Sequence, residues 1–323
     1  MNAHERMKTV LSGDTPDRPA YALWQHFPGS DRSPERLARA TIDFARTWKP
    51  DLLKHTPNGM YAVEDWAAGL DAVPIEVNEQ EGVPYSLNLS VDWRRLSRLD
   101  VRSGALGREL LSLRLVCDAI GRDVPVFMTV FGPLTLAAKI CGMRIVDNIR
   151  QAPDDLHEGL RTITDTMVAF MRAVREAGAD GVYFATQFAS HDLVSEDEYA
   201  VFGEPYDLEV LEAWGDAGPV ILHLCGPNIF FGLSNSYPVQ AVCWDHGISS
   251  PTFRDAFAMT NCTIVAGMQE RTFPLSSQGV FEQASDALAV SKGVRHILAP
   301  TCVIPSDAPD ESLVAVLKAV QSA

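Results

Sequence analysis

Short apolar segments alternate with longer amphipathic segments along most of the chain. Eight apolar segments are rich in β-branched and aromatic residues, which favours strands. They span residues 21–27, 51–56, 125–132, 179–186, 219–225, 239–245, 262–268 and 295–301. Between them, residues 154–178 repeat apolar positions at helical spacing and close at Gly178. Ser33, with Glu35 close behind, marks the start of another helix.

Eight strands that alternate with helices predict an α/β fold, a (β/α)₈ TIM-type barrel. Residues 57–124 exceed the length of one connection, so we expect an extra insertion between strands 2 and 3, with a strand pair near residues 84–93. A doubly wound open sheet is the alternative, but no Gly-x-Gly-x-x-Gly turn follows an early strand. No linker or low-complexity segment divides the sequence, so residues 1–323 are expected to form a single barrel domain.

The composition indicates which classes of partner are disfavoured and in which cellular compartment the protein is expected. A formal net charge of −15 argues against nucleic acid and anionic membranes as partners, and against a highly carboxylated substrate unless basic residues line the pocket. No apolar run of about 18 residues is present and the N-terminus lacks a secretory pattern, so we expect a cytoplasmic protein. Six cysteines in such a chain favour burial, metal binding or catalysis over disulfides. No feature of the sequence indicates an oligomeric state.

Polar and sulfur-containing side chains collect at the ends of the predicted strands. A barrel carries its active site at the C-terminal ends of its strands, so this is where we expect the chemistry. The residues at these ends are Gln25, His26, His55, Gln187, His223, Cys225, Asp245, His246, Gln269 and Cys302. Of these, His26, Gln187 and Gln269 are predicted to line a substrate pocket.

The segment "VILHLC" places His223 and Cys225 on one face of a strand. Imidazole and thiolate are ligands that Zn²⁺ prefers, and Cys302, at the end of the last strand, could provide a third. His246 is a candidate fourth ligand, with Asp245 as its competitor. The alternative interpretation makes Cys302 a packed core thiol and lets His223 hydrogen-bond a backbone carbonyl.

Segments along most of the chain resemble the uroporphyrinogen decarboxylase superfamily, whose fold is a (β/α)₈ barrel. They are "DRPAYALW", "TVFGPLTLAAKICG", "REAGADGVYFAT" and "ILAPTCVIPSDAPDESLVAVLKAV". Decarboxylases of this superfamily carry an arginine-rich segment after the first strand and an aspartate after the second. Here "LWQHFPGSD" has no arginine before Arg32, and "LLKHTPNGMYAVEDW" offers no counterpart of that aspartate.

The sequence is instead similar to the zinc-dependent corrinoid methyltransferases of that superfamily, the methylcobamide:coenzyme M type. Their signature is a His-x-Cys strand followed by a cysteine at the last strand, which His223, Cys225 and Cys302 match. The resemblance implies a Zn²⁺ that activates a substrate thiol, with no separate protein nucleophile. An acidic residue near the sixth strand can complete the metal shell in this branch, so Asp245 or His246 would stand in for it.

The resemblance also implies that a methyl group moves between a corrinoid and a small thiol or methylated small molecule, in either direction. No Gly-Gly dipeptide or cobalamin-binding motif is present, so a corrinoid-carrying partner protein is expected to deliver the methyl-corrinoid. Two other functions stay open. One is a uroporphyrinogen decarboxylase-like lyase that needs no metal, and the other is a non-catalytic barrel that binds a tetrapyrrole or corrinoid.

Overall fold

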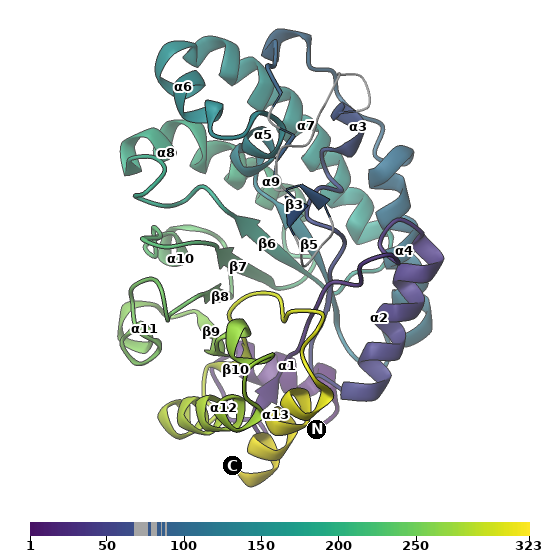
Figure 1. The fold of residues 1–323 in the computed structure, drawn as a ribbon, viewed down its shortest axis with the longest axis vertical. Coiled ribbons are helices and arrows are strands. Elements are labelled where there is room, and N and C mark those ends of the chain that lie inside the picture. The colour runs from purple at the N-terminus through teal and green to yellow at the C-terminus, as the bar shows by residue number, and fades with distance from the viewer. Residues whose placement is uncertain (68–76, 79–82, 85, 88) are drawn as a thin grey trace.

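Eight parallel strands form one curled sheet at the centre of the molecule (Figure 1). The computed structural model describes residues 1–67, 77–78, 83–84, 86–87 and 89–323. The strand order is β1-β10-β9-β8-β7-β6-β5-β2. The strands are β1 (Ala20–Tyr21), β2 (Leu53–His55), β5 (Val126–Phe131), β6 (Gly181–Thr186), β7 (Val220–Leu224), β8 (Ala241–Trp244), β9 (Thr263–Met268) and β10 (His296–Pro300). The predicted (β/α)₈ TIM-type fold is therefore confirmed.

The two outer strands of this sheet, β1 and β2, approach each other just beyond their ends. Ala22 and Leu52 form an isolated parallel bridge, and the backbone N–H of Asp51 donates to the carbonyl of Tyr21 at 2.9 Å. These contacts join the first strand to the second, as the closure of a barrel requires.

Helices surround the curled sheet, and most of them cover its outer face (Figure 1). They are α1 (Ala3–Leu11), α2 (Pro34–Trp48), α5 (Pro133–Cys141), α6 (Arg144–Gln151), α7 (Pro153–Glu176), α8 (Glu196–Phe202), α9 (Glu204–Trp214), α10 (Leu233–Ser236), α11 (Phe253–Met259), α12 (Ser277–Ser291) and α13 (Asp310–Ser322), with a 3-10 turn, η2 (Glu270–Thr272). In the described ranges, no helix has the length and apolarity needed to cross a membrane.

Helix ends follow the capping signals of the sequence. The hydroxyl of Ser33 accepts the backbone N–H of Arg36 at the start of α2, as a helix cap does. The long helix expected over residues 154–178 is α7, and Gly178 beyond its end has a φ of +97°. Only glycine adopts that conformation without strain, so Gly178 allows the chain to turn toward β6.

Several short elements lie between β2 and β5. They are α3 (Glu64–Ala67), an antiparallel pair of β3 (Val77–Asn78) and β4 (Val83–Pro84), a 3-10 turn η1 (Trp93–Arg95), and α4 (Gly104–Ile120). The strand pair predicted near residues 84–93 falls partly on positions 85 and 88, which lie outside the described residues.

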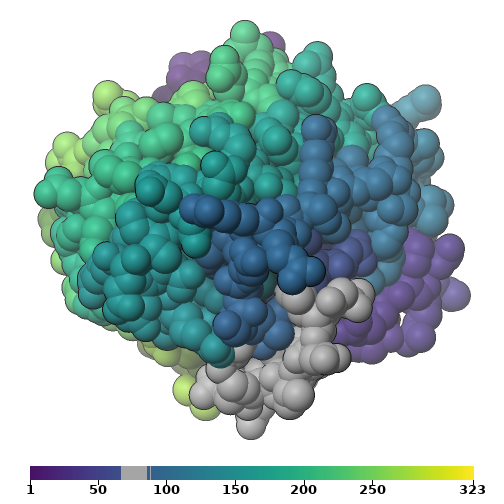
Figure 2. All heavy atoms as spheres, turned by 90° about the horizontal axis from the view of Figure 1, so that it is seen from above, coloured from purple at the N-terminus to yellow at the C-terminus, as the bar shows by residue number. Residues whose placement is uncertain are grey.

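Part of this stretch runs beside the end of α5. The backbone N–H groups of Leu87 and Leu89 donate to the carbonyls of Lys139 and Ile140, at 2.7 and 2.9 Å. Figure 2 shows described residues of this stretch, in blue, beside the teal residues that follow β5. The stretch is therefore attached to the helix that begins directly after β5.

Alternate residues of each strand face either the barrel interior or the helices. One apolar cluster fills the interior and includes Trp24, Tyr183, Ile221 and Cys243. A larger cluster lies between the strands and the helices. Helix α1 contributes Met7 and Val10 to the interior cluster, and so closes the barrel at the N-terminal ends of the strands.

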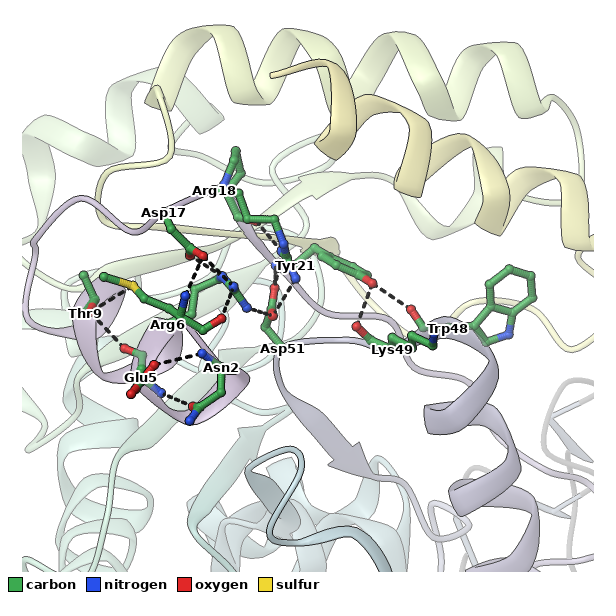
Figure 3. Close-up of polar contacts among 12 residues, drawn as sticks. Asn2, Glu5, Arg6, Thr9, Asp17, Arg18, Tyr21, Trp48, Lys49 and Asp51 are labelled. Atoms are coloured by element: carbon green, nitrogen blue, oxygen red, sulfur yellow. Dashed lines mark hydrogen bonds and ion pairs between the residues drawn. The ribbon is translucent and has the colours of Figure 1, made fainter.

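A buried ion-pair network fastens α1 to that end of the barrel (Figure 3). The carboxylate of Asp51 accepts from Arg6 at 2.6 Å and from Arg18 at 2.7 Å. It also accepts the backbone N–H of Tyr21 at 3.1 Å. One carboxylate thus connects α1, β1 and the segment that leads into β2.

Candidate active site

Strand β7 carries the first two candidate metal ligands to the open end of the barrel. All five of its residues are buried, and the strand alternation puts His223 on the same side as Ile221 in the interior. His223 is 7% exposed. Cys225 follows the strand and donates its backbone N–H to the carbonyl of Thr186 at 3.1 Å. Gly226, with a φ of +100°, then ends the strand.

Cys302 reaches the same place from β10. Strand alternation would put Thr301 in the interior and Cys302 outside, but the chain leaves the sheet here. Thr301 still donates its backbone N–H to Met268 at 2.8 Å, and its hydroxyl donates to Glu270 at 2.6 Å. Interaction with Cys225 raises the pKa of the Cys302 thiol, and interaction with His223 lowers it. The three side chains predicted as metal ligands thus lie near enough to influence one another's pKa.

The two thiols differ in acidity because they share one hydrogen bond. The bond from Cys302 lowers the pKa of the Cys225 thiol, and the positive charge of Lys139 and a hydrogen bond with Gln187 lower it further. The same bond, together with burial, raises the pKa of Cys302 well above its usual value. Cys225 is therefore the thiol that loses its proton first, which makes it the better metal ligand of the two.

The pKa of the His223 imidazole is higher than its burial alone would give. Burial lowers its pKa, but interactions with the thiols of Cys243 and Cys302 outweigh burial and raise it to about 9.

The chemistry of this donor set fits zinc, since it combines two thiols with an imidazole. The side chains of His223, Cys225 and Cys302 are not positioned as an assembled metal site would require. Across the described ranges, no group of three or more His, Cys, Asp or Glu side chains is arranged so that it could hold a metal ion. A metal would therefore require these side chains to turn toward a common centre.

The two candidates for a fourth ligand point in different directions. Asp245 is 7% exposed and accepts from Arg271 at 2.7 Å and from the backbone N–H of Gly247 at 2.9 Å. His246 lies against the ring of Phe253, with ring centroids 5.6 Å apart, and its Nε2 has no hydrogen-bond partner. Asp245 is thus held by an ion pair, whereas His246 belongs to the layer between strand and helix.

Of the residues predicted to line a substrate pocket, Gln187 lies nearest the thiols. Its side chain hydrogen-bonds Cys225, and its backbone N–H donates to the hydroxyl of Thr135 at 2.9 Å. Gln269 instead packs its side chain over Gly247 in the neighbouring loop. His26 is buried beyond the end of β1 and is 8% exposed.

His55 and Lys54 are adjacent in β2 and face opposite sides of the sheet. His55 shares the side of Leu53, which packs toward the helices, and burial lowers its pKa to about 4. Lys54 faces the interior, where its Nζ lies 3.9 Å from the centroid of the Tyr183 ring. His55 is therefore a neutral core residue at neutral pH, and Lys54 is the polar residue that β2 brings to the barrel.

Sequence reasoning missed three buried side chains near the thiols: Lys54, Lys139 and Tyr183. Tyr183 is fully buried, and its Oη lies 3.2 Å from Nδ1 of His223. Two signals were available in the sequence. A lysine interrupts the apolar strand 51–56, and the period of two places Tyr183 on the same face of its strand as Gln187.

A buried carboxyl group supports the strand beside Cys225. Asp207 of α9 accepts from the hydroxyls of Tyr199 at 2.6 Å and Tyr237 at 2.9 Å. Tyr199 in turn is hydrogen-bonded to Thr186 at 2.9 Å. Burial raises the pKa of Asp207 to about 7, although both tyrosines lower it. Asp207 is therefore protonated over much of the acidic range.

This raised pKa predicts a specific pH dependence of stability. Between about pH 4 and pH 7 the folded state keeps a proton that the unfolded state has lost, so stability falls as pH rises. Relative to Asp207→Asn, the wild type should lose roughly 1.4 kcal/mol of unfolding free energy per pH unit in this window. Urea unfolding of both proteins from pH 4.5 to 8 measures the difference. Parallel profiles would show that Asp207 does not titrate in this way.

A model of the uroporphyrinogen decarboxylase (URO-D) family matches residues 16–323 of the chain. The methylcobamide:CoM methyltransferase MtbA of Methanosarcina acetivorans is 27% identical over 230 residues, which cover 69% of this chain and 65% of that one. The uroporphyrinogen decarboxylase of Nocardia farcinica is 29% identical over 262 residues, 72% of this chain and 70% of that one. The chain thus spans less than two thirds of the length of MtbA.

A solved structure, a methyltransferase from Methanosarcina mazei, is similar over 100% of this chain and 99% of its own. The TM-score is 0.83 at 18% sequence identity. At this identity the likeness concerns the fold, and it agrees with the eight-stranded barrel.

Proposed function

The chain belongs to the uroporphyrinogen decarboxylase family, and within that family we propose that it is a zinc-dependent methyltransferase. It would move a methyl group between a corrinoid, carried by a partner protein, and a small thiol. The observation that carries this proposal is that β7 and the loop after β10 bring His223, Cys225 and Cys302 to the open end of the barrel, where they influence one another's pKa. Two thiols and an imidazole brought together from different strands have no evident use in core packing.

Two further observations favour methyl transfer over decarboxylation. Relatives from Methanosarcina are methylcobamide:CoM methyltransferases, and their name describes transfer of a methyl group between methylcobamide and CoM, a thiol. The loop after β1 offers a porphyrinogen little positive charge. Its arginine, Arg32, lies 62% exposed with a nitrogen 3.6 Å from a carboxylate oxygen of Glu64. Because the uroporphyrinogen decarboxylase of Nocardia farcinica is also similar to this chain, a lyase function is the alternative.

His223, Cys225 and Cys302 would hold the zinc ion, with Asp245 or His246 as a fourth ligand. When bound, zinc would lower the pKa of a substrate thiol and leave its sulfur nucleophilic. The nearby charge of Lys139 favours the thiolate form of Cys225, which ligation requires. Gln187, hydrogen-bonded to Cys225, lies where it would also contact the substrate.

The chain itself would contribute position and a dry setting rather than a nucleophile. The substrate sulfur would take the methyl group from the corrinoid, with a carbon–sulfur bond formed in place of the cobalt–carbon bond. The bonding electron pair would stay with cobalt, and the thiol proton would leave to solvent. His26 and Gln269 are proposed to line the pocket around the bound thiol.

We also propose that the chain acts in the cytoplasm as a single barrel domain that meets the corrinoid protein at the C-terminal ends of the strands. This is the face at which His223, Cys225 and Cys302 meet, and the methyl-corrinoid must come within reach of a thiol bound there. Nucleic acid and membranes are not proposed as partners, because a net charge of −15 disfavours both.

A methyl-transfer assay with free methylcobalamin as donor and CoM as acceptor tests the function. We expect the zinc-supplied protein to consume methylcobalamin and to form S-methylated CoM, with uroporphyrinogen left intact. Decarboxylation of uroporphyrinogen by a protein that lacks His223, Cys225 and Cys302 would contradict the proposal. It would establish the metal-free lyase in its place.

A further inference from the structure

We propose that Glu109 of α4 is a pH-sensitive switch that sets how firmly α3 is held against α4. A proton on Glu109 leaves α3 held, and loss of that proton weakens the hold. The groups involved are those of the α3–α4 cluster, which we define as Glu64, Arg108 and Glu109, together with Asp31. None of them belongs to the candidate metal site, so the switch operates with or without a bound metal.

Arg108 lies between the two carboxyl groups of the α3–α4 cluster. Its two terminal nitrogens donate to Glu64 of α3, at 2.9 and 3.1 Å, and its Nε donates to Glu109 at 2.7 Å. Glu109 has no exposed side-chain surface, and the side chains of Arg108 and Glu64 are mostly buried. One guanidinium group is therefore shared by two acids that lie on different helices.

Of these two acids, Glu109 is the one with fewer donors. Its Oε2 is buried and has no hydrogen-bond partner among the described residues. Glu64 also accepts from Nδ2 of Asn58 at 3.1 Å, and one of its oxygens lies 3.6 Å from a nitrogen of Arg32. A buried carboxylate oxygen without a donor is costly, and a proton removes that cost because it neutralises the group. A proton taken up by the cluster therefore goes to Glu109.

The surrounding charges also favour a proton on Glu109. Burial raises the pKa of Glu109 to about 7, although Arg108 opposes this shift. The negative charges of Glu64 and of Asp31, a buried acid in the loop after β1, act in the same direction as burial. Burial raises the pKa of Glu64 as well, but hydrogen bonds from Arg108 and Asn58 outweigh it and lower that pKa. Glu64 therefore stays charged while Glu109 titrates near neutral pH.

The helices and the strand packed against α4 bring uncharged side chains to the interface. The buried residues of α2, α7 and β5 are all uncharged. The other titratable groups on β2, on α3 and in the loops after β1 and β2 are His26, Arg32, Lys54, His55, Tyr61 and Asp65. Burial keeps two of them neutral, since it lowers the pKa of His55 to about 4 and raises that of Tyr61 well above its usual value.

Helix α3 depends on side-chain contacts for its position. It has four residues, and a single turn of helix is not stable by itself. Besides Arg108, α3 meets α4 through Asp65, which accepts the backbone N–H of Ala105 at 2.8 Å. Arg32 reaches Glu64 from the loop after β1, which borders the proposed pocket. A weaker pairing of Glu64 with Arg108 therefore loosens α3 and this side of the barrel opening.

The direction of the pH effect follows from the proton on Glu109. Without it, two neighbouring carboxylates repel each other and compete for the guanidinium of Arg108. Release of α3 admits water to Glu109, so its pKa falls toward the ordinary value of 4.5. Between that value and about pH 7, the held state keeps a proton that the released state has lost, so release becomes easier as pH rises. Above pH 7 both states have lost the proton and the effect is complete.

Hydrogen exchange of the intact protein, read by mass spectrometry on peptides that cover α3 and the first turn of α4, tests the switch. After correction for the intrinsic effect of pH, exchange in the wild type should rise about tenfold per pH unit from about pH 5 to 7 and then level off. Glu109→Gln keeps the shape of the neutral acid, so its exchange should stay slow at every pH. Glu209→Gln, the loss of an exposed acid paired with Arg161, is the matched control and should follow the wild type.

Glu64→Gln provides a second variant if Glu109→Gln does not fold. With its acidic neighbour removed, Glu109 has Arg108 to itself, so its pKa falls and exchange should level off at a lower pH than in the wild type. An equal rise in wild type and Glu109→Gln, or wild-type exchange that does not change with pH, would overturn the inference. So would a pH profile of Glu64→Gln that matches the wild type.

Discussion

Replacement of Cys225 by serine is expected to abolish zinc binding and to slow methyl transfer on the order of 10³-fold or more. Cys225 is the more acidic of the paired thiols, because Cys302 and Lys139 both lower its pKa. A serine hydroxyl stays protonated at neutral pH and is a poor ligand for zinc, so the site would lose its thiolate. The loss corresponds to the several kcal/mol of charge stabilisation that a bound metal supplies.

Metal analysis and initial rates with methylcobalamin and CoM measure both effects. Cys117→Ser is the matched control, because Cys117 is a half-buried cysteine of α4 whose pKa burial raises to about 12. The control should keep its zinc and its rate. Retention of one zinc per chain and of the full rate in Cys225→Ser would remove this residue from the site.

Replacement of Asp51 by alanine is expected to destabilise the fold by about 3–5 kcal/mol, because it breaks a buried ion-pair network (Figure 3). The Asp51 side chain is 2% exposed and Arg6 is 7% exposed, so both guanidinium groups on Asp51 would lose a buried partner. The same change releases the backbone N–H of Tyr21 and loosens the point at which α1 closes the barrel. A fall in Tm of about 4–7 °C is expected for a chain of this length.

Thermal and urea unfolding measure this effect against Arg39→Ala. Arg39 and Asp43 form an ion pair at 3.9 Å with side chains 85% and 63% exposed. Loss of an exposed pair should cost less than about 0.5 kcal/mol. Equal stability of the Asp51→Ala and Arg39→Ala proteins would show that the buried network does not hold the barrel closed.

The barrel strands were predictable because burial on both faces leaves a clear sequence pattern. Each strand of a parallel barrel is a short apolar run between turn signals. Seven of the eight predicted runs contain a whole strand, and the first, 21–27, overlaps β1 only at Tyr21. The period of two also explains why His223 and Cys225 share the barrel interior with Tyr183. The prediction was wrong in β2, where a shift of one residue changes which side chain faces the interior. Lys54, and not the neighbouring His55, points into the barrel.

Other parts of the site depend on contacts that no local pattern encodes. Cys302 lies beyond β10, and the turn of the loop, rather than strand alternation, brings it to Cys225. Asp245 and His246 adjoin in sequence, yet one meets Arg271 and the other meets Phe253. The stretch between β2 and β5 is held by backbone bonds such as that from Leu87 to Lys139, between residues far apart in sequence. Such pairings follow from the assembled fold.

The zinc content of the purified chain, washed with chelator and then supplied with zinc, is the most direct test of the proposed metal site, measured beside the Cys302→Ser variant. We expect about one zinc per wild-type chain, and loss or marked weakening of binding in the variant. A resupplied wild type without zinc would show that no zinc site is present. His223 and Cys225 would then be the end of a core strand, and the metal-free lyase would become the function to test.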